Sequence, residues 1–332
     1  MLRRNLLALL CSLCLVAPLG CTPGKGGAAS GKITIAVIPK GTTHEFWKSV
    51  HAGAVKASKE LGVDIVWKGP VKEDDLKDQI DVVQSFTAQG VSGIVLAPLN
   101  DKALGGAVKA AVGAKIPVVV FDSDLQGHEH TSFVATDNVA AGRLAGEALG
   151  KLLGGKGKVV LLRYQEGSAS TANREQGFLE GIKKTPDVQI VSDNQYGGAT
   201  TESAFSTSER ILGAQKAADG GVSGVFCPNE STTFGMLLAL QKAGLAGKIK
   251  LVGFDSSPKL VAGLASGQID GLVLQDPFNI GYLAVKTMVQ HLKGEKVEAR
   301  IDTGARLVTK ENMNEPATKE LLSPDLEKWL GK

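Results

Sequence analysis

The sequence predicts an α/β protein with two doubly wound, parallel-sheet domains of the same topology. Short apolar runs alternate with amphipathic stretches along the 332 residues, and the same order of segments occurs twice. A chain of this length exceeds one ordinary core and suits two domains. The hydrophobic fraction of 43% is typical of a folded globular protein.

The strands of the first half are expected where apolar, β-branched runs end at Gly, Pro or Asn, as in parallel strands covered on both faces. These runs are residues 33–38, 63–67, 93–96 and 117–121. Apolar residues spaced three and four apart predict helices between the strands. The helices are expected at 45–61, 74–89 and 102–113. Strands that alternate with helices indicate a parallel sheet wound on both faces.

The second half repeats this plan. Gly-Val-Ser-Gly at 90–93 recurs at 221–224, and Phe-Asp-Ser at 121–123 recurs at 254–256. The opening strand has a similar counterpart at 158–162. The repeats lie roughly 130 residues apart, which is a common domain size. These repeated segments predict two domains of the same topology.

The repeated Phe-Asp-Ser motif places Asp122 and Asp255 just beyond the ends of equivalent strands. Ligands of open parallel sheets bind outside the carboxyl ends of strands. If the halves face each other, both carboxylates point into one cleft. The alternative is that each Asp only caps the helix that follows.

Enzyme and nucleic-acid motifs are missing from the sequence. It has no Gly-x-x-x-x-Gly-Lys-Ser/Thr phosphate loop and no Gly-x-Ser-x-Gly nucleophile motif. The glycines at 154–157 precede a strand and are interpreted as the end of a helix at 139–153. A net charge of +3 gives no electrostatic case for nucleic-acid binding. The sequence therefore predicts a protein that is not an enzyme and needs no cofactor.

The first residues have the pattern of an export signal. Two arginines precede an apolar run at 6–16, which is shorter than the roughly 20 residues that span a bilayer. A small residue before Cys21 favours a lipoprotein cleavage site, with Cys21 as the lipid anchor. Residues 1–20 are then the signal peptide, and 21–32 a flexible tether. A plain secretory signal cut nearby is the alternative.

Few residues suit a disulfide or a metal site. After cleavage Cys227 has no partner and is expected as a small apolar core residue. The run His128-Glu129-His130 could be imagined as a metal site but is interpreted as a solvated turn. We therefore expect no metal.

The ordered motifs between 32 and about 310 resemble the ribose-type, type I periplasmic binding proteins, the sugar receptors of ABC importers. The resemblance implies two Rossmann-like lobes joined by a three-crossing hinge. It implies crossings near Asp137, Gln275 and Gly304. The expected parts are an N-terminal lobe at 33–136 plus 277–304, a C-terminal lobe at 137–276 plus 305–312, and a tail at 313–332.

The same resemblance implies a ligand site of polar and aromatic side chains. The implied ligand-binding residues are Lys40, His44, Phe46, Trp47, Asp122, Ser123, Arg174, Asn229, Asp255 and Gln275. The aromatic rings suit the C–H face of a sugar, although Phe46 and Trp47 could instead be helix core. Carboxylates that accept, with Arg, Lys, Asn and Gln that donate, are what sugar hydroxyls require.

The resemblance leaves the ligand open within the class of monosaccharides and polyols. Ribose receptors carry Arg where this chain has Ser123, and Lys40 also resembles rhamnose-, arabinose- and autoinducer-2-binding relatives. Lys40, His44 and Arg174 would also tolerate an acidic sugar. The implied partners are an ABC permease and its ATPase, with no nucleic acid and membrane contact only through the lipid anchor. The protein is expected as an extracytoplasmic monomer. A receptor for a furanose signal or for chemotaxis is the competing function.

Overall fold

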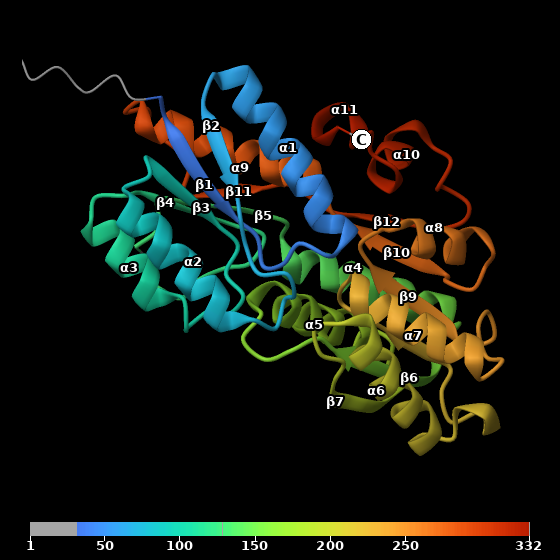
Figure 1. Cartoon of the computed structure of the whole chain (residues 1–332). Coiled ribbons are helices and arrows are strands. Elements are labelled where there is room, and N and C mark those ends of the chain that lie inside the picture. The colour runs from blue at the N-terminus through green and yellow to red at the C-terminus, as the bar shows by residue number, and fades with distance from the viewer. Residues whose placement is uncertain (1–31, 128, 332) are drawn as a thin grey trace, which may run out of the picture. The chain divides into compact units, whose positions relative to one another are not determined.

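The buried apolar runs form two six-stranded sheets in the computed structural model, which describes residues 32–127 and 129–331 (Figure 1). Both sheets lie in one unit that begins at Ile33. The first sheet has the order β11 (Arg300–Asp302), β5 (Ser132–Ala135), β4 (Val118–Phe121), β3 (Gly93–Leu96), β1 (Thr34–Ile38) and β2 (Asp64–Trp67). The second has the order β12 (Arg306–Val308), β10 (Gly271–Leu274), β9 (Lys250–Phe254), β8 (Gly224–Phe226), β6 (Lys156–Arg163) and β7 (Asp187–Tyr196).

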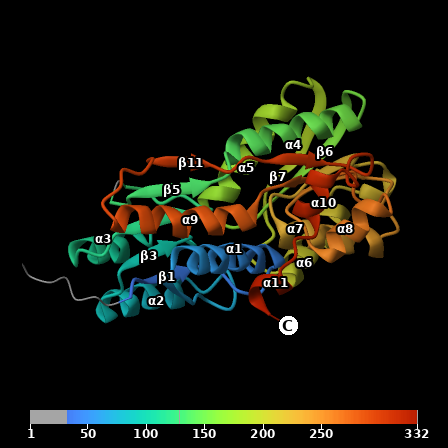
Figure 2. The same cartoon turned by 90° about the horizontal axis from the view of Figure 1, so that it is seen from above.

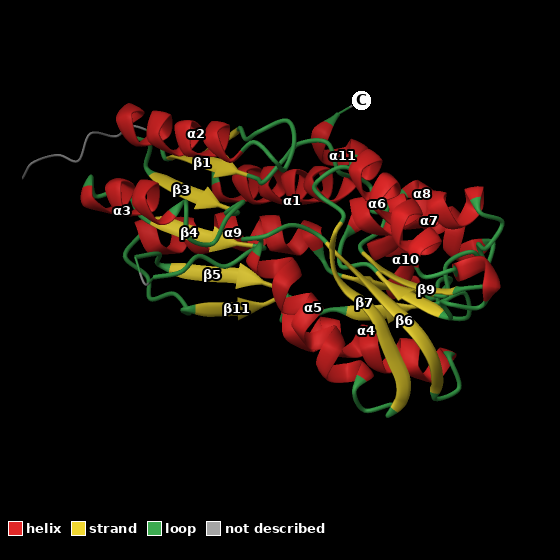
Figure 3. Ribbon diagram, turned by 90° about the horizontal axis from the view of Figure 1, so that it is seen from below, coloured by secondary structure: helices red, strands yellow, loops and turns green. Residues whose placement is uncertain are grey.

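The two sheets have the same topology, which confirms the predicted pair of doubly wound parallel sheets (Figure 3). Neighbouring strands are parallel except β12, which runs antiparallel to β10. The shared Phe-Asp-Ser motif ends the equivalent strands β4 and β9.

Helices cover both faces of each sheet (Figure 2). On the first sheet, α1 (Glu45–Leu61) and α9 (Pro277–Leu292) cover one face, and α2 (Leu76–Gln89) and α3 (Gly105–Gly113) cover the other. On the second sheet, α4 (Asn138–Leu152) and α5 (Ala169–Ile182) lie opposite α6 (Thr201–Ala214), α7 (Glu230–Lys242) and α8 (Pro258–Ala265). A short 3-10 helix, η1 (Ala217–Asp219), precedes β8. Alternate residues of β1 enter the two layers, as a strand buried on both faces requires.

Capping side chains explain where two helices differ from expectation. Helix α2 begins two residues later than predicted because the carboxylate of Asp75 accepts a hydrogen bond from the N–H of Asp78, at 2.9 Å. Helix α3 begins at Gly105 rather than at Lys102. Asn100 Oδ1 accepts from the N–H groups of Lys102 and Ala103, which holds these residues in a turn.

The chain passes between the sheets three times, after β5, after β10 and between β11 and β12. The first and third passages are hydrogen-bonded to each other. Thr136 Oγ1 donates to the carbonyl of Gly304 at 3.1 Å, and Asp302 Oδ1 accepts from the N–H of Asp137 at 2.9 Å. Gly304 has a φ of 74°, a left-handed conformation that glycine adopts without steric cost.

The segment expected as a tail carries α10 (Pro316–Leu322) and α11 (Glu327–Leu330). Leu322 is buried in the core of the second sheet, whereas α11 packs on α1 of the first. Among the described residues, no helix has the length and apolar character that crossing a membrane requires.

Candidate functional site

Asp122 and Asp255 occupy equivalent turns at the carboxyl ends of β4 and β9. Both have left-handed backbone conformations, with φ values of 59° and 67°, which Asp tolerates better than most residues. The N–H of each bonds to the neighbouring strand, Asp122 to Val134 and Asp255 to Val273. Neither caps the helix or strand that follows it, because β5 follows Asp122 and Ser257 caps α8. Asp255 Oδ2 instead accepts from the N–H of Glu230, the first residue of α7, at 3.2 Å. The strained, matched turns aim both carboxylates at one place.

Arg174 lies between the two carboxylates. Its Nη2 is 4.0 Å from Asp122 Oδ1, and its Nη1 is 4.0 Å from Asp255 Oδ2. The side chain is held by Asn138 Oδ1, which accepts from Nε at 2.8 Å, and by the ring of Phe254, 4.1 Å from the guanidinium carbon. Nη2 is buried and has no hydrogen-bond partner. An orphaned donor beside two carboxylates is suited to a hydroxyl of a ligand.

Close packing of α5 on α4 makes this position of Arg174 possible. A Cβ atom on Gly142 of α4 would overlap the carbonyl oxygen of Arg174. The glycine therefore permits the close approach of the two helices that brings Arg174 to Asn138.

Lys40 follows β1 and connects the two sheets at this edge. Its Nζ lies 3.2 Å from Asp122 Oδ2 and donates to Ser168 Oγ at 3.2 Å and Ser170 Oγ at 3.0 Å. Lys40 is 3% exposed, so these partners replace water around its ammonium group. Ser123 lies just behind, where its Oγ accepts from the N–H of Ser170.

Glu73, in the loop before α2, is the centre of a buried hydrogen-bond network. Its carboxylate accepts at 2.6 Å from Trp47 Nε1, His44 Nδ1 and the hydroxyl of Tyr164. Burial alone would raise the pKa of Glu73. The charges of His44 and Lys40 and the hydrogen bonds from His44 and Tyr164 outweigh that effect and lower the pKa to about 2. Tyr164 follows β6, so this network joins the two sheets.

Two further groups near Glu73 have displaced pKa values. Burial would lower the pKa of His44, but Glu73, Glu230 and Asp255 raise it to about 9. Burial raises the pKa of Glu230 to about 7, with Asp255 adding to the rise and His44 opposing it. Burial likewise raises the pKa of Asp255, against the charge of Arg174. His44 is therefore a cation at neutral pH, and Glu230 titrates near neutrality.

The two aromatic residues at the start of α1 belong both to the core and to the site. Phe46 and Trp47 pack in the hydrophobic cluster beneath α1, with ring centroids 4.9 Å apart. The backbone N–H of Phe46 donates to Glu230 Oε2 at 3.3 Å. Both side chains also line the cavity described below, so burial in the core does not exclude contact with a ligand.

Asn229 and Gln275 have structural partners as well. Asn229 caps α7, where its Oδ1 accepts from Thr232 Oγ1 at 2.6 Å. Gln275 Nε2 donates to Asp255 Oδ1 at 2.7 Å, and its Oε1 is buried without a partner. A ligand could therefore use only the hydrogen-bonding capacity of the Asn229 amide that capping leaves free.

These groups enclose a cavity of about 20 Å³ between the two sheets. Nine of the ten residues expected from the sequence line it, and Ser123 does not. The lining residues are Lys40, His44, Phe46, Trp47, Glu73, Asp122, Tyr164, Ser170, Thr171, Arg174, Asn229, Glu230, Asp255 and Gln275. A cavity of this size holds one water molecule, so it must widen before a larger ligand enters.

Sequence reasoning missed five of these lining residues, among them Glu73, Tyr164 and Glu230. Their positions after the carboxyl ends of strands could have identified them. Glu73 and Tyr164 follow the carboxyl ends of β2 and β6, and Glu230 begins α7 after β8. The rule that located the two aspartates applies to every strand of a parallel sheet.

No cluster of three potential metal ligands occurs in the part of the chain that the structure describes. Of the run considered as a metal site, His128 lies outside the described residues, as does Cys21. Cys227 is fully buried in the core of the second sheet, and burial raises the pKa of its thiol.

Known proteins resemble this chain over most of its length. The ribose import binding protein RbsB of Escherichia coli is 30% identical over 287 residues, which cover 85% of this chain and 93% of that protein. The D-allose-binding periplasmic protein of Escherichia coli is 27% identical over 270 residues, covering 79% and 85%.

Solved structures show the same fold. A carbohydrate transporter solute binding protein from Agrobacterium radiobacter, in complex with D-arabinose, has a TM-score of 0.83 and 36% identity, covering 89% of this chain and 100% of that one. An ABC transporter solute binding protein from Agrobacterium vitis with bound D-fucose has a TM-score of 0.82 and 36% identity, covering 87% and 100%. The family model described as "Periplasmic binding protein domain" matches residues 35–296. The chain therefore belongs to the periplasmic binding proteins, which are substrate-binding proteins of transporters and not enzymes.

Proposed function

We propose that this protein is the substrate-binding protein of an ABC importer and closes its two lobes around one uncharged monosaccharide. The observation that carries the proposal is the cavity between the sheets, whose walls combine paired carboxylates, cations and aromatic rings. It works outside the cytoplasm, which the family description and the D-allose-binding periplasmic protein support.

Charge balance in the cavity favours a neutral ligand. The cations are Lys40, Arg174 and His44, whose pKa of about 9 keeps it protonated. Glu73, Asp122 and Asp255 provide as many carboxylates. An acidic or basic sugar would add an unbalanced charge to this balanced set, and uncompensated buried charge is costly. Glu230, with a pKa of about 7, is partly ionised at neutral pH, so it leaves no excess positive charge for an acidic sugar.

The spacing around Arg174 suggests how hydroxyls are held. Its two 4.0 Å separations from Asp122 and Asp255 are too long for hydrogen bonds. A sugar hydroxyl placed between them could accept from the guanidinium and donate to a carboxylate. Charge-assisted bonds of this kind contribute roughly 1.5–3 kcal/mol each. The unpartnered Nη2 of Arg174 gains a partner in this arrangement.

Binding and closure are coupled because the site residues come from both lobes. Lys40, Glu73 and Asp122 belong to the first sheet and its loops, whereas Tyr164, Arg174 and Asp255 belong to the second. A ligand that contacts both sets stabilises the closed arrangement over an open one. The three passages between the sheets act as the hinge, and the permease and its ATPase then recognise the closed form.

Attachment to the membrane is proposed through Cys21, with residues 21–32 as the tether. We also propose that the protein works as a monomer, because one chain supplies both walls of the cavity.

A thermal-shift screen tests the proposed function. D-Ribose, D-allose, D-arabinose and D-fucose are compared with glucuronate and glucosamine, which carry opposite charges. A neutral sugar at 100 times its Kd should stabilise the protein by about 2.7 kcal/mol. Saturable stabilisation by at least one neutral sugar, and by neither charged sugar, is expected. Stabilisation by a charged sugar alone would contradict the charge argument, and no response to any sugar would contradict the function.

A further inference from the structure

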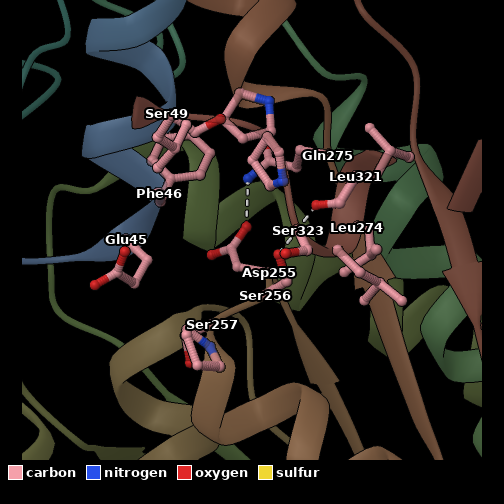
Figure 4. Close-up of a pocket in the computed structure, with 15 residues that line it drawn as sticks. Glu45, Phe46, Ser49, Asp255, Ser256, Ser257, Leu274, Gln275, Leu321 and Ser323 are labelled. Atoms are coloured by element: carbon pink, nitrogen blue, oxygen red, sulfur yellow. Dashed lines mark hydrogen bonds between the residues drawn. The ribbon is translucent and has the colours of Figure 1, made fainter. Parts of the chain in front are cut away.

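A second cavity, of about 120 Å³, lies beside the sugar site beneath the C-terminal segment (Figure 4). Phe46, Asp255 and Gln275 line both cavities, so the two cavities adjoin at these residues. We call residues 316–331, with α10 and α11, the strap, and the cavity beneath it the strap pocket.

The strap is fixed to both lobes, so its wall of the pocket is well defined. On the second sheet, Leu322 enters the core, and Ser256 Oγ donates to the carbonyl of Leu321 at 3.3 Å. On the first, the ring of Trp329 lies 6.2 Å from that of Phe278 in α9, and Lys59 Nζ lies 5.5 Å from the Trp329 ring. These contacts hold the strap across the edge of the sugar site.

The surface of the strap pocket is more apolar than polar, although polar residues such as Glu45, Asp255 and Ser257 also line it. Leu274, Leu321 and Leu326 provide aliphatic surface. Ser49 Oγ and Gln275 Oε1 also face this region, and both are buried without a hydrogen-bond partner. Buried polar atoms in proteins are nearly always satisfied, so two orphans in one pocket indicate a missing partner. The pocket therefore suits a mostly apolar group that carries an oxygen.

We propose that the strap pocket is a second subsite, which takes the alkyl or aryl group of a glycoside whose sugar ring occupies the site between the lobes. Ser49 Oγ would donate to the glycosidic or substituent oxygen, and the leucines would surround the carbon atoms. The inference rests on the proposed function, since the sugar ring must bind in the adjoining site between the lobes. It extends that function from free sugars to glycosides.

Calorimetric titration compares D-ribose, D-allose, D-arabinose and D-fucose with their methyl and phenyl glycosides in both anomeric forms. At least one glycoside should bind within threefold of its parent sugar or more tightly, with about a fourfold gain for each buried methyl. Leu321→Trp fills the strap pocket without touching the sugar site. It should weaken that glycoside at least tenfold and leave the parent sugar within twofold. Leu326→Trp, in the same wall, repeats the test if Leu321→Trp does not fold.

The control is Leu152→Trp, the same substitution at a position of α4 that is 38% exposed, and it should change neither affinity. The subsite is overturned if no glycoside comes within threefold of its parent. It is also overturned if Leu321→Trp weakens parent and glycoside alike. Failure of every free sugar to bind would instead count against the proposed function, so the two failures are distinct.

Discussion

Glu73→Gln removes the negative charge at the centre of the network that joins the lobes. Glu73 is 6% exposed, and its carboxylate accepts three hydrogen bonds at 2.6 Å, one of them from Tyr164 across the cleft. Glutamine keeps the shape, but its amide places a donor where one acceptor was. It also leaves His44 without its ionised partner. The substitution therefore weakens the closed form without creating a cavity.

The magnitude follows from the bonds lost. A hydrogen bond to a charged group contributes about 1.5–3 kcal/mol, and Glu73→Gln loses one bond and weakens two. We expect a loss of about 2–4 kcal/mol in the free energy of closure. Because the ligand binds the closed form, its Kd should rise roughly 30- to 1000-fold.

Calorimetric titration with a sugar identified by the thermal-shift screen measures this effect. The matched control is Glu147→Gln, which breaks an exposed ion pair between Glu147 of α4 and Lys184, just beyond the end of α5. Such pairs contribute about 0–1 kcal/mol, so the control should bind normally. Binding by Glu73→Gln within twofold of the wild type would refute the role given to this network.

Three other predictions concern the aromatic residue, the pH dependence and the anchor. Trp47→Phe deletes the donor to Glu73 Oε1 and should lower sugar affinity by about 1–3 kcal/mol, and the fluorescence response to sugar should vanish; an unchanged response would assign it to Trp67 or Trp329. His44 has a raised pKa, so its stabilisation of the folded protein is complete below pH 6.5 and is lost as pH rises through about 9, a change of about 3 kcal/mol in the free energy of unfolding. The pKa of Glu230 is also raised, so its contribution to stability is lost between pH 4.5 and about 7, in the same direction. Thermal denaturation should therefore show stability falling between pH 4.5 and about 9, and His44→Gln should reduce the fall above pH 6.5. A rise in stability between pH 4.5 and about 9 would contradict both assignments. Cys21→Ser should release the protein from the membrane fraction with sugar binding intact, and continued membrane association would show that Cys21 is not the anchor.

Much of the fold was predictable because its signals are local. Runs such as Val118–Phe121 are buried on both faces and therefore continuously apolar. The repeated Phe-Asp-Ser motif located the two aspartates because equivalent strands end at the same edge of each sheet. β7 was harder to find, since this edge strand is only partly buried and carries polar residues along its length.

The remaining features depend on tertiary contacts that leave little trace in the sequence. Glu73 stands in a run of acidic and basic residues that is typical of a solvated loop, and only the folded chain brings Trp47 and Tyr164 to it. The strap is similar, because its short helices are held by Trp329 and Leu322 against separate lobes. Such positions depend on which surfaces meet rather than on hydrophobic period.

The central claim is that one sugar is gripped from both lobes, and a double-mutant cycle on Asp122 and Asp255 tests it most directly. Asn tolerates the left-handed turns at both positions, so Asp122→Asn and Asp255→Asn should preserve the fold. Calorimetric titration should show a loss of about 2–4 kcal/mol for each single mutant. The double mutant should lose less than the sum, because a ligand released by one lobe no longer stabilises closure. Wild-type affinity in either single mutant, or strictly additive losses, would contradict the two-lobe mechanism.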